Sequence, residues 1–193
     1  MELQIEKAAK VLKEGGIVIF PTDTAFGIGC RMDDQAAIKR LFILRKRPEN
    51  QATPVLFDSV ETIENYLLAI PQEVKEKLMD KYWPGALTIV LPCKVEKISN
   101  LVRGNSNNLG VRIPNNDITL SVIKKAGVGI LGPSANFHGE SPPYDFKDLN
   151  PELISLVDYV LKGECKFKDV STVIDCSVSP WKIIREGVVK LNL

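Results

Sequence analysis

The stretch that decides the fold is GGIVIFPTDTAFGIGC, residues 15–30. Its four consecutive apolar residues, Ile17–Phe20, predict a strand buried on both faces, which is typical of a sheet that helices cover. The strand ends in the polar segment PTDT, residues 21–24, and Gly27 and Gly29 leave room beside it. A cluster of hydroxyl and carboxylate groups at the end of a buried strand indicates either an ordinary turn or a binding site.

Outward from this stretch, helical and strand patterns alternate along the chain. The apolar spacing predicts helices over residues 2–14, from 33 or 34 to about 47, near 60–69 and 72–82, over 117–126 and near 149–156. Short apolar runs predict strands over residues 17–20, 54–57, 86–91, 109–113, 128–131, 157–161, 172–176 and 181–185. Pro71 is expected in the first turn of the helix over 72–82. The alternation predicts a three-layer α/β fold with a largely covered sheet.

Length and composition limit the class of protein. The 193 residues fit one domain, so we expect a single unit over residues 1–193. No apolar run approaches the ~20 residues that span a bilayer, and the N-terminus does not resemble a signal peptide. We therefore expect a cytoplasmic protein without a membrane segment. The net charge is only +1, so an anionic partner must meet a local cluster of Lys and Arg.

Several familiar kinds of site are disfavoured. Four widely spaced cysteines and the single His138 do not form a zinc pattern, so no metal site is predicted and each cysteine is expected to be a small buried residue. GVGILG, residues 127–132, matches a dinucleotide fingerprint, but a helix precedes it and its own apolar residues form the strand. Catalysis by Ser134 and His138 lacks an evident orienting acid.

Three polar clusters lie next to predicted strands: PTDT at 21–24, GPSAN at 132–136, and Ser171–Thr172. Ligands of α/β sheets bind in the crevice at strand ends, where small side chains let backbone N–H groups approach. Ordinary turn chemistry also explains any one of these clusters. Three together favour a binding site.

Four arginines also suggest a site for an anion. Arg45 and Arg47 end the second helix, where the simplest interpretation is a solvated basic helix end. Arg112 and Arg185 lie in predicted strands, where a guanidinium is costly to bury without an anion. Together the four side chains predict a crevice for a polyanion such as a triphosphate.

The motifs as a set resemble one family. PTDTAFGIG (21–29), RKRP (45–48), WPGALTIVL (83–91), VRIP (111–114), PSAN (133–136) and STVID (171–175), followed by an Arg-x-Gly at 185–187, are similar to the YrdC-like threonylcarbamoyl-AMP synthases. The resemblance runs in the family's order from about residue 5 to residue 188. It is closest to the single-domain members, without the C-terminal domain that some relatives carry.

The resemblance implies an activity. L-threonine, bicarbonate and ATP are condensed to threonylcarbamoyl-AMP and pyrophosphate, and Mg²⁺ is expected to arrive with ATP. A partner tRNA-modifying transferase complex then uses the product to modify adenosine 37 of tRNA. The implied fold is a twisted mixed sheet flanked by helices, with a basic concave face that would allow contact with tRNA or double-stranded RNA.

The resemblance also implies roles for residues. It places three residues in the catalytic set: Arg47, Ser134 and Asn136. It assigns six to ATP binding: Arg45, Arg47, Thr53, Asn108, Ser134 and Arg185. It assigns four to threonine binding: Thr24, Arg112, Gly132 and Ser171.

This sequence departs from the family pattern at several positions. Arg45 stands where a lysine is usual, Phe26 where a tyrosine is usual, Asp58 where a histidine is common and Pro142 where a serine is expected. Asp23 could contact magnesium, but a role in stabilising the turn is the favoured interpretation. Two other functions stay open from the sequence: an RNA-binding protein without catalysis, and a related carbamoyl-adenylate enzyme such as those of hydrogenase maturation.

Overall fold

The computed structural model describes residues 1–192, and within them short strands and helices alternate along the chain. The strands are β1 (Val18–Phe20), β2 (Gly27–Gly29), β3 (Val55–Leu56), β4 (Leu87–Pro92), β5 (Asn108–Arg112), β6 (Ile130–Leu131), β7 (Tyr159–Val160), β8 (Thr172–Asp175) and β9 (Lys182–Arg185). The α-helices are α1 (Glu2–Lys13), α2 (Gln35–Leu44), α3 (Val60–Glu64), α4 (Gln72–Val74), α5 (Asp80–Tyr82), α6 (Asn100–Arg103), α7 (Asp117–Ala126) and α8 (Pro151–Leu156). A π-helical segment, η1 (Lys75–Met79), joins α4 to α5, and η2 (Val95–Lys97) and η3 (Phe146–Asp148) are 3₁₀ turns.

The strands form two sheets, one ordered β2-β1-β7 and the other β6-β3-β5-β4-β8-β9. Both sheets are mixed: β1 is antiparallel to β2 and parallel to β7, while β4 is antiparallel to β5 and parallel to β8. β2 and β6 join the two sheets through antiparallel bridges, with Ile28 N–H donating to Pro133 O and Leu131 N–H donating to Cys30 O, both at 2.9 Å. The junction brings the segment after β1 next to the segment after β6.

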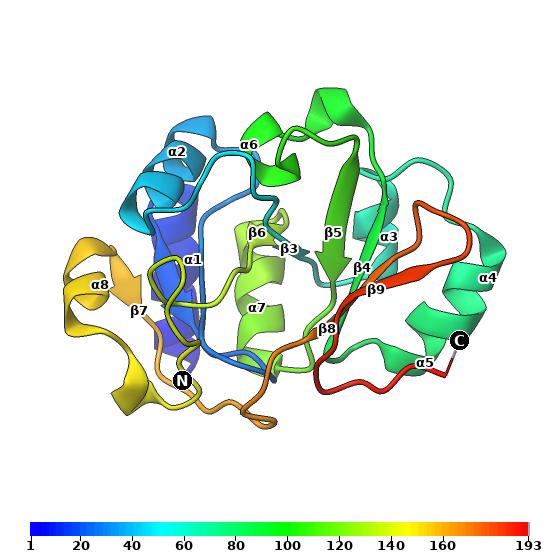
Figure 1. Cartoon of the computed structure of the whole chain (residues 1–193). Helices are drawn as coiled ribbons and strands as arrows, with labels where there is room; N and C mark the ends of the chain where they lie inside the picture. The colour runs from blue at the N-terminus through cyan, green and yellow to red at the C-terminus, as the bar shows by residue number, and fades with distance from the viewer. Residues whose placement is uncertain (193) are drawn as a thin grey trace.

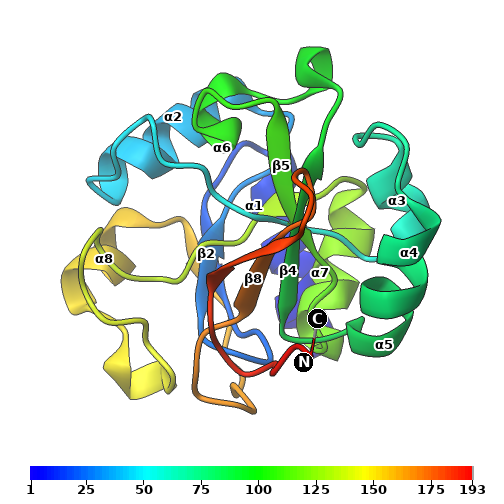
Figure 2. The same cartoon turned by 45° about the vertical axis from the view of Figure 1, so that its right-hand side comes forward.

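Helices cover the sheets from different sides. α1 and α7 lie side by side (Figure 1), and Leu12 and Val122 share one hydrophobic cluster with Phe20 of β1. α3, α4 and α5 lie together beyond β4 (Figure 2), and α4 and η1 add Val74 and Leu78 to the main cluster. The prediction of a mixed sheet flanked by helices is confirmed.

Local chemistry explains the helix ends. Asp34, one of the two caps predicted for α2, accepts hydrogen bonds from the N–H groups of Ala36 and Ala37. α7 begins at the Asn116 cap and ends at Gly127, whose φ of 77° is the left-handed conformation that glycine adopts most readily. α1 ends where Gly15 takes a φ of 81°.

The structure corrects several predicted boundaries. The helix expected near 60–69 ends at Glu64, and α2 ends at Leu44 rather than near Arg47. Pro71 is the cap of the helix that follows, one residue before its first turn. β2 and α6 are absent from the sequence prediction.

The interior agrees with the sequence in other respects. Ile17, Val18, Ile19 and Phe20 are all fully buried, as expected of a strand covered on both faces. All four cysteines are buried and free of disulfides, which confirms the prediction for them. None of the helices in the described part of the chain has the length and hydropathy needed to span a membrane.

Candidate active site

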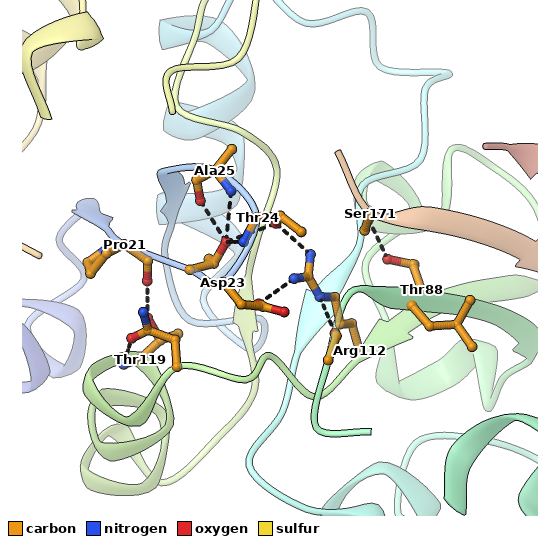
Figure 3. Close-up of polar contacts among 12 residues, drawn as sticks. Pro21, Asp23, Thr24, Ala25, Thr88, Arg112, Thr119 and Ser171 are labelled. Atoms are coloured by element: carbon orange, nitrogen blue, oxygen red, sulfur yellow. Dashed lines mark hydrogen bonds and ion pairs between the residues drawn. The ribbon is translucent and has the colours of Figure 1, made fainter. Parts of the chain in front are cut away.

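The PTDT segment is a turn organised by the Thr22 hydroxyl. Thr22 Oγ1 donates to Ala25 O at 2.6 Å and accepts from the N–H groups of Thr24 and Ala25 at 3.1 and 3.2 Å (Figure 3). The Thr119 hydroxyl of α7 donates to Pro21 O and fixes the start of the turn. The turn is therefore held from within and from the helix below it.

The Thr24 side chain links this turn to Arg112. Its Oγ1 lies 3.0 Å from Thr22 Oγ1 and accepts a hydrogen bond of 3.0 Å from Arg112 Nη1. Thr22 Oγ1 donates to Ala25 O and accepts from two backbone N–H groups, so its proton and both of its lone pairs are already engaged. A hydroxyl oxygen accepts twice, so one lone pair of Thr24 is left for a ligand that donates a hydrogen bond.

Arg112, on β5, lies below the turn in a network of three acceptors. Its Nε donates to Gly85 O at 2.9 Å, its Nη1 to Thr24, and its Nη2 to Asp23 Oδ1 at 2.5 Å (Figure 3). Asp23 and Arg112 are 1% and 5% exposed, so this is a buried ion pair. Burial lowers the pKa of Arg112, and Asp23 opposes that shift. The carboxylate therefore keeps the guanidinium charged and oriented.

Arg185, on β9, donates hydrogen bonds to Ser171, the residue that directly precedes β8. Its Nε donates to Ser171 O at 3.0 Å and its Nη2 to Ser171 Oγ at 2.9 Å. Ser171 Oγ also lies 3.1 Å from Thr88 Oγ1 on β4 (Figure 3). Burial and then the charge of Arg112 lower the pKa of Arg185. The two guanidinium groups are thus near enough to repel each other, and an anion between them would relieve that repulsion.

Arg45 and Arg47 form a second pair of charges at the end of α2. Lys46 between them takes a φ of 55°, which ends the helix. Arg45 is 2% exposed; its Nε donates to Asn136 O at 3.1 Å, and its buried Nη1 has no partner among the described residues. Burial, and then the charge of Arg47, lower the pKa of Arg45 to about 10. A buried donor without a partner indicates a site for a ligand acceptor.

Arg47 is fixed by the loop that follows it. Its Nε donates to Gln51 O at 3.1 Å and its Nη2 donates to Ala52 O. Burial lowers the pKa of Arg47. Next to it, the buried Thr53 hydroxyl also has no partner among the described residues. Both side chains therefore keep donors available.

These groups line one cavity of about 330 Å³. The cavity brings together ten of the predicted site residues: Thr24, Arg45, Arg47, Thr53, Asn108, Arg112, Gly132, Ser134, Ser171 and Arg185. Its lining contains these four arginines and no acidic side chain, with Asp23 behind Arg112 as the nearest compensating charge. Such a lining suits a ligand with several negative charges.

Asn136 is the predicted site residue that the structure does not bring to the cavity. Its Nδ2 donates to Phe137 O at 2.8 Å and to Glu140 O at 2.9 Å, and its backbone oxygen accepts from Arg45. Asn136 therefore holds the loop after β6 and the Arg45 guanidinium in place. Gly132, from the same segment, does line the cavity, and a Cβ added there would lie 2.3 Å from Leu56 Cγ.

Three of the four residues that depart from the family pattern line the cavity. Arg45 and Pro142 line the cavity, and so does Phe26, whose ring is fully buried and meets Phe146 edge to face at 6.0 Å. Asp58 is not part of the lining and accepts a hydrogen bond of 3.0 Å from Thr62.

Other lining residues were missed from the sequence. Thr88 is the clearest, since a polar residue within the apolar run ALTIVL is a signal that its side chain has a partner. Ser106, Val90, Val173 and Ile184 carry no comparable signal. Among the described residues, no three His, Cys, Asp or Glu side chains gather to hold a metal ion.

Comparison with known proteins identifies the family. The family model for Sua5, YciO and YrdC proteins, described as "Telomere recombination", matches residues 10–187. The chain belongs to the Sua5/YciO/YrdC family. The YrdC-like resemblance predicted from the motifs is thereby confirmed.

Two relatives in this family are named "Threonylcarbamoyl-AMP synthase". The protein from Bacillus subtilis is 31% identical over 188 residues, and that from Pyrococcus abyssi is 33% identical over 192 residues. The alignments cover 95% and 99% of this chain but 53% and 56% of the two relatives. The chain thus spans about half the length of these curated relatives.

A solved structure supports the same relationship. Pyrococcus abyssi Sua5 complexed with L-threonine superposes on this chain with a TM-score of 0.92 at 32% identity. The superposition covers 97% of this chain and 55% of the Sua5 chain.

Proposed function

We propose that this protein is a threonylcarbamoyl-AMP synthase, which forms threonylcarbamoyl-AMP and pyrophosphate from L-threonine, bicarbonate and ATP. The observation that carries the proposal is the cavity that four arginines and several hydroxyl groups line. Two relatives at 31% and 33% identity carry the name of this activity. The structure of Pyrococcus abyssi Sua5, which has the same fold as this chain, was solved in complex with L-threonine.

The amino acid is assigned to the part of the cavity around Arg112. The guanidinium of Arg112 would hold the threonine carboxylate, and the free lone pair of Thr24 would accept from the threonine amine or hydroxyl. Ser171 and Gly132 would complete this end of the site.

ATP is assigned to the remaining lining. Arg45, Arg47 and Arg185 would neutralise the phosphates, while Thr53 and Ser134 would donate hydrogen bonds to them. Asn108 would contact the nucleoside. The lining provides no carboxylate for a resident metal, so Mg²⁺ would enter with ATP, bound by phosphate oxygens and water.

The chemistry needs positioning rather than a protein nucleophile. The threonine nitrogen attacks the carbon of bicarbonate, and loss of water gives a carbamate. A carbamate oxygen then attacks the α-phosphorus, and the bond to the β-phosphate oxygen breaks to release pyrophosphate. Holding the reactants in line contributes ~7–11 kcal/mol to lowering a barrier, and fixed cations stabilise the charge that develops. Arg47 and Ser134 are the groups assigned to that role.

The product would serve tRNA modification. Threonylcarbamoyl-AMP is a mixed anhydride that water hydrolyses, so it requires a partner that accepts it directly. We assign that role to a tRNA-modifying transferase complex, and we place the activity in the cytoplasm. A basic concave face that contacts tRNA or double-stranded RNA stays a prediction.

The test is an incubation of the protein with ATP, labelled bicarbonate and each amino acid in turn. Pyrophosphate release and a labelled adenylate with threonine alone are expected. Turnover with a different carbamoyl donor and no threonine dependence would instead support a related carbamoyl-adenylate enzyme. Salt-sensitive RNA binding without any turnover would support the non-catalytic function.

A further inference from the structure

One end of the cavity floor is built from a row of side chains on three adjacent strands. Asn108 of β5 pairs with Pro92 of β4, and Val90 of β4 pairs with both Gly110 of β5 and Asp175 of β8. Side chains two residues apart point to the same face of a strand. Asn108 and Gly110 both line the cavity, which places this end of the floor beside the Asp175 position.

A chain of hydrogen bonds crosses this row. Asp175 Oδ1 accepts from Ser177 Oγ at 2.6 Å and from Ser177 N at 2.8 Å. Ser177 Oγ in turn accepts from Asn108 Nδ2 at 2.9 Å. None of the sequence motifs drew attention to Asp175 or Ser177 as part of a site.

The direction of this chain fixes the orientation of the Asn108 amide. A serine hydroxyl has a single proton, and the carboxylate of Asp175 is the stronger acceptor for it. Ser177 Oγ can then only accept from Asn108, so the amide must turn its NH₂ group to Ser177. Asn108 Oδ1 has no partner in the described part of the chain. Because Asn108 lines the cavity, its Oδ1 can accept a hydrogen bond from a ligand there.

The floor next to Asn108 suits a flat ring. Gly110 has no side chain, and a Cβ there would have its nearest neighbour, Thr88 Cγ2, at 3.6 Å. Val90 and Val173 line the same floor, and the 57% exposed Ile184 stands at its side. An apolar floor with a polar group beside it suits a heterocyclic base.

We infer that Asp175 and Ser177 are positioning residues that orient Asn108 to accept a hydrogen bond from the 6-amino group of adenine. The inference rests on the proposed function for the identity of the ligand as a nucleotide substrate. The same oxygen would face the 6-carbonyl of guanine, leaving two acceptors opposed. The Asp175–Ser177–Asn108 chain therefore selects ATP over GTP.

The first test needs only the unaltered protein. Affinities for ATP, purine riboside triphosphate and inosine triphosphate are measured by calorimetry, since these ligands differ only in the group at position 6 of the base and, for inosine triphosphate, in the proton on the adjacent N1. Purine riboside triphosphate lacks the amino group and is expected to bind about tenfold more weakly than ATP. Inosine triphosphate and GTP, with a carbonyl there, are expected to bind more weakly still. Equal affinities for ATP and purine riboside triphosphate would overturn the inference.

The second test releases the amide. Ser177→Ala removes the hydroxyl that accepts from Nδ2, so the amide can turn over and donate to a carbonyl. The preference for ATP over inosine triphosphate is expected to fall about tenfold, with affinity for the latter rising. Ser177→Thr keeps the hydroxyl and is expected to keep the preference. If Ser177→Ala lowered the affinities for ATP and inosine triphosphate equally, Ser177 would have only a structural role and the orienting role would be refuted.

The control is Ser155→Ala, which makes the same chemical change on α8, where the hydroxyl bonds only Glu152 O. It is expected to leave both affinities unchanged. The proposed function is judged separately by threonine-dependent release of pyrophosphate. Selective ATP binding without that turnover would sink the proposed function and leave the selectivity standing. Threonine-dependent turnover with ATP and GTP alike would support the proposed function and overturn the selectivity.

Discussion

At the scale of single residues, the cavity depends on hydroxyl and guanidinium groups whose hydrogen bonds are already partly committed. The Thr22 proton goes to Ala25 O, and the Thr22 oxygen accepts from the N–H groups of Thr24 and Ala25. Arg112 is held by Gly85, Thr24 and Asp23 before any ligand arrives. Groups fixed in this way lose little conformational freedom when a ligand binds.

Thr24→Val tests this arrangement with almost no change in side-chain volume. The substitution removes the acceptor for Arg112 Nη1 and the lone pair available to the amino acid. Because hydrogen bonds that involve a charged partner contribute ~1.5–3 kcal/mol, threonine-dependent pyrophosphate release is expected to fall about ten- to hundredfold. Initial-rate measurements at saturating ATP check this.

Thr62→Val is the matched control, because Thr62 of α3 donates a hydrogen bond to Asp58 and does not line the cavity. Its turnover is expected to equal that of the unaltered protein. Full activity of Thr24→Val would remove Thr24 from the threonine site.

The lining of the cavity was largely predictable at this scale, because its residues carry chemistry that is unusual next to buried strands. Arg112 lies within the apolar strand LGVRI, and Ser171 lies just before the strand TVID; a polar side chain at either place requires a hydrogen-bonding partner. Asn136 shows the limit of this reasoning. It lies in the same motif as Ser134, but its amide turns back to the loop that contains Glu140. Asp175 and Ser177 escaped notice because their role exists only through contact with Asn108, 69 residues away along the chain from Ser177.

At the scale of elements, the junction between β2 and β6 decides whether the site exists. It places Gly27 opposite Ser134 and thus brings the PTDT turn to the GPSAN segment. Gly29 lies where the strands come closest, since a Cβ there would be 1.8 Å from Leu131 O. That contact is with backbone, which cannot turn aside as a side chain can.

Gly29→Ala is therefore expected to be severe. It forces β2 and β6 apart and lowers the free energy of unfolding by on the order of 3 kcal/mol, with turnover lost because Thr24 and Ser134 separate. Urea denaturation and the pyrophosphate assay measure the two effects.

Gly127→Ala provides the comparison, because Gly127 has a φ of 77° and a Cβ added there would have no atom within 4 Å. Only backbone strain is expected there, about 1 kcal/mol, with activity retained. Equal effects of the two substitutions would show that the junction has no special role.

The same elements show how far the fold follows from the sequence. α7 was predicted over 117–126, its observed bounds, because Gly127 interrupts the helical pattern there; the structure adds Asn116 as the cap at its start. β2 was not predicted, since three residues of which two are glycine carry no strand pattern, and their pairing with β1 and β6 is what makes them a strand. α3 was predicted too long because the apolar residues after Glu64 pack into the core without continuing the helix.

At the scale of the whole molecule, the four thiols report on its integrity. Burial raises the pKa of Cys30 and of Cys176 to about 12 and that of Cys165 to about 11. Burial also raises the pKa of Cys93. Only the thiolate is nucleophilic, so at pH 8 each group stays protonated in the folded state.

The native protein is accordingly expected to react very slowly with Ellman's reagent at pH 8, while all four thiols react at once in 6 M guanidinium chloride, where their pKa values return to about 8.5. Absorbance of the released thionitrobenzoate measures this, and saturating ATP with threonine should slow the native reaction further by suppressing unfolding. Rapid labelling of a native thiol would contradict the packing described here.

The cavity also has a consequence for biosynthesis. Thr24 comes from the turn after β1, whereas Ser171 and Arg185 come from the last two strands. A ribosome must therefore have synthesised the chain as far as Arg185 before all of the groups that line the cavity can meet. A chain that stops before residue 171 lacks Ser171 and Arg185, so the ligands of the proposed function would stabilise it less than they stabilise the folded chain.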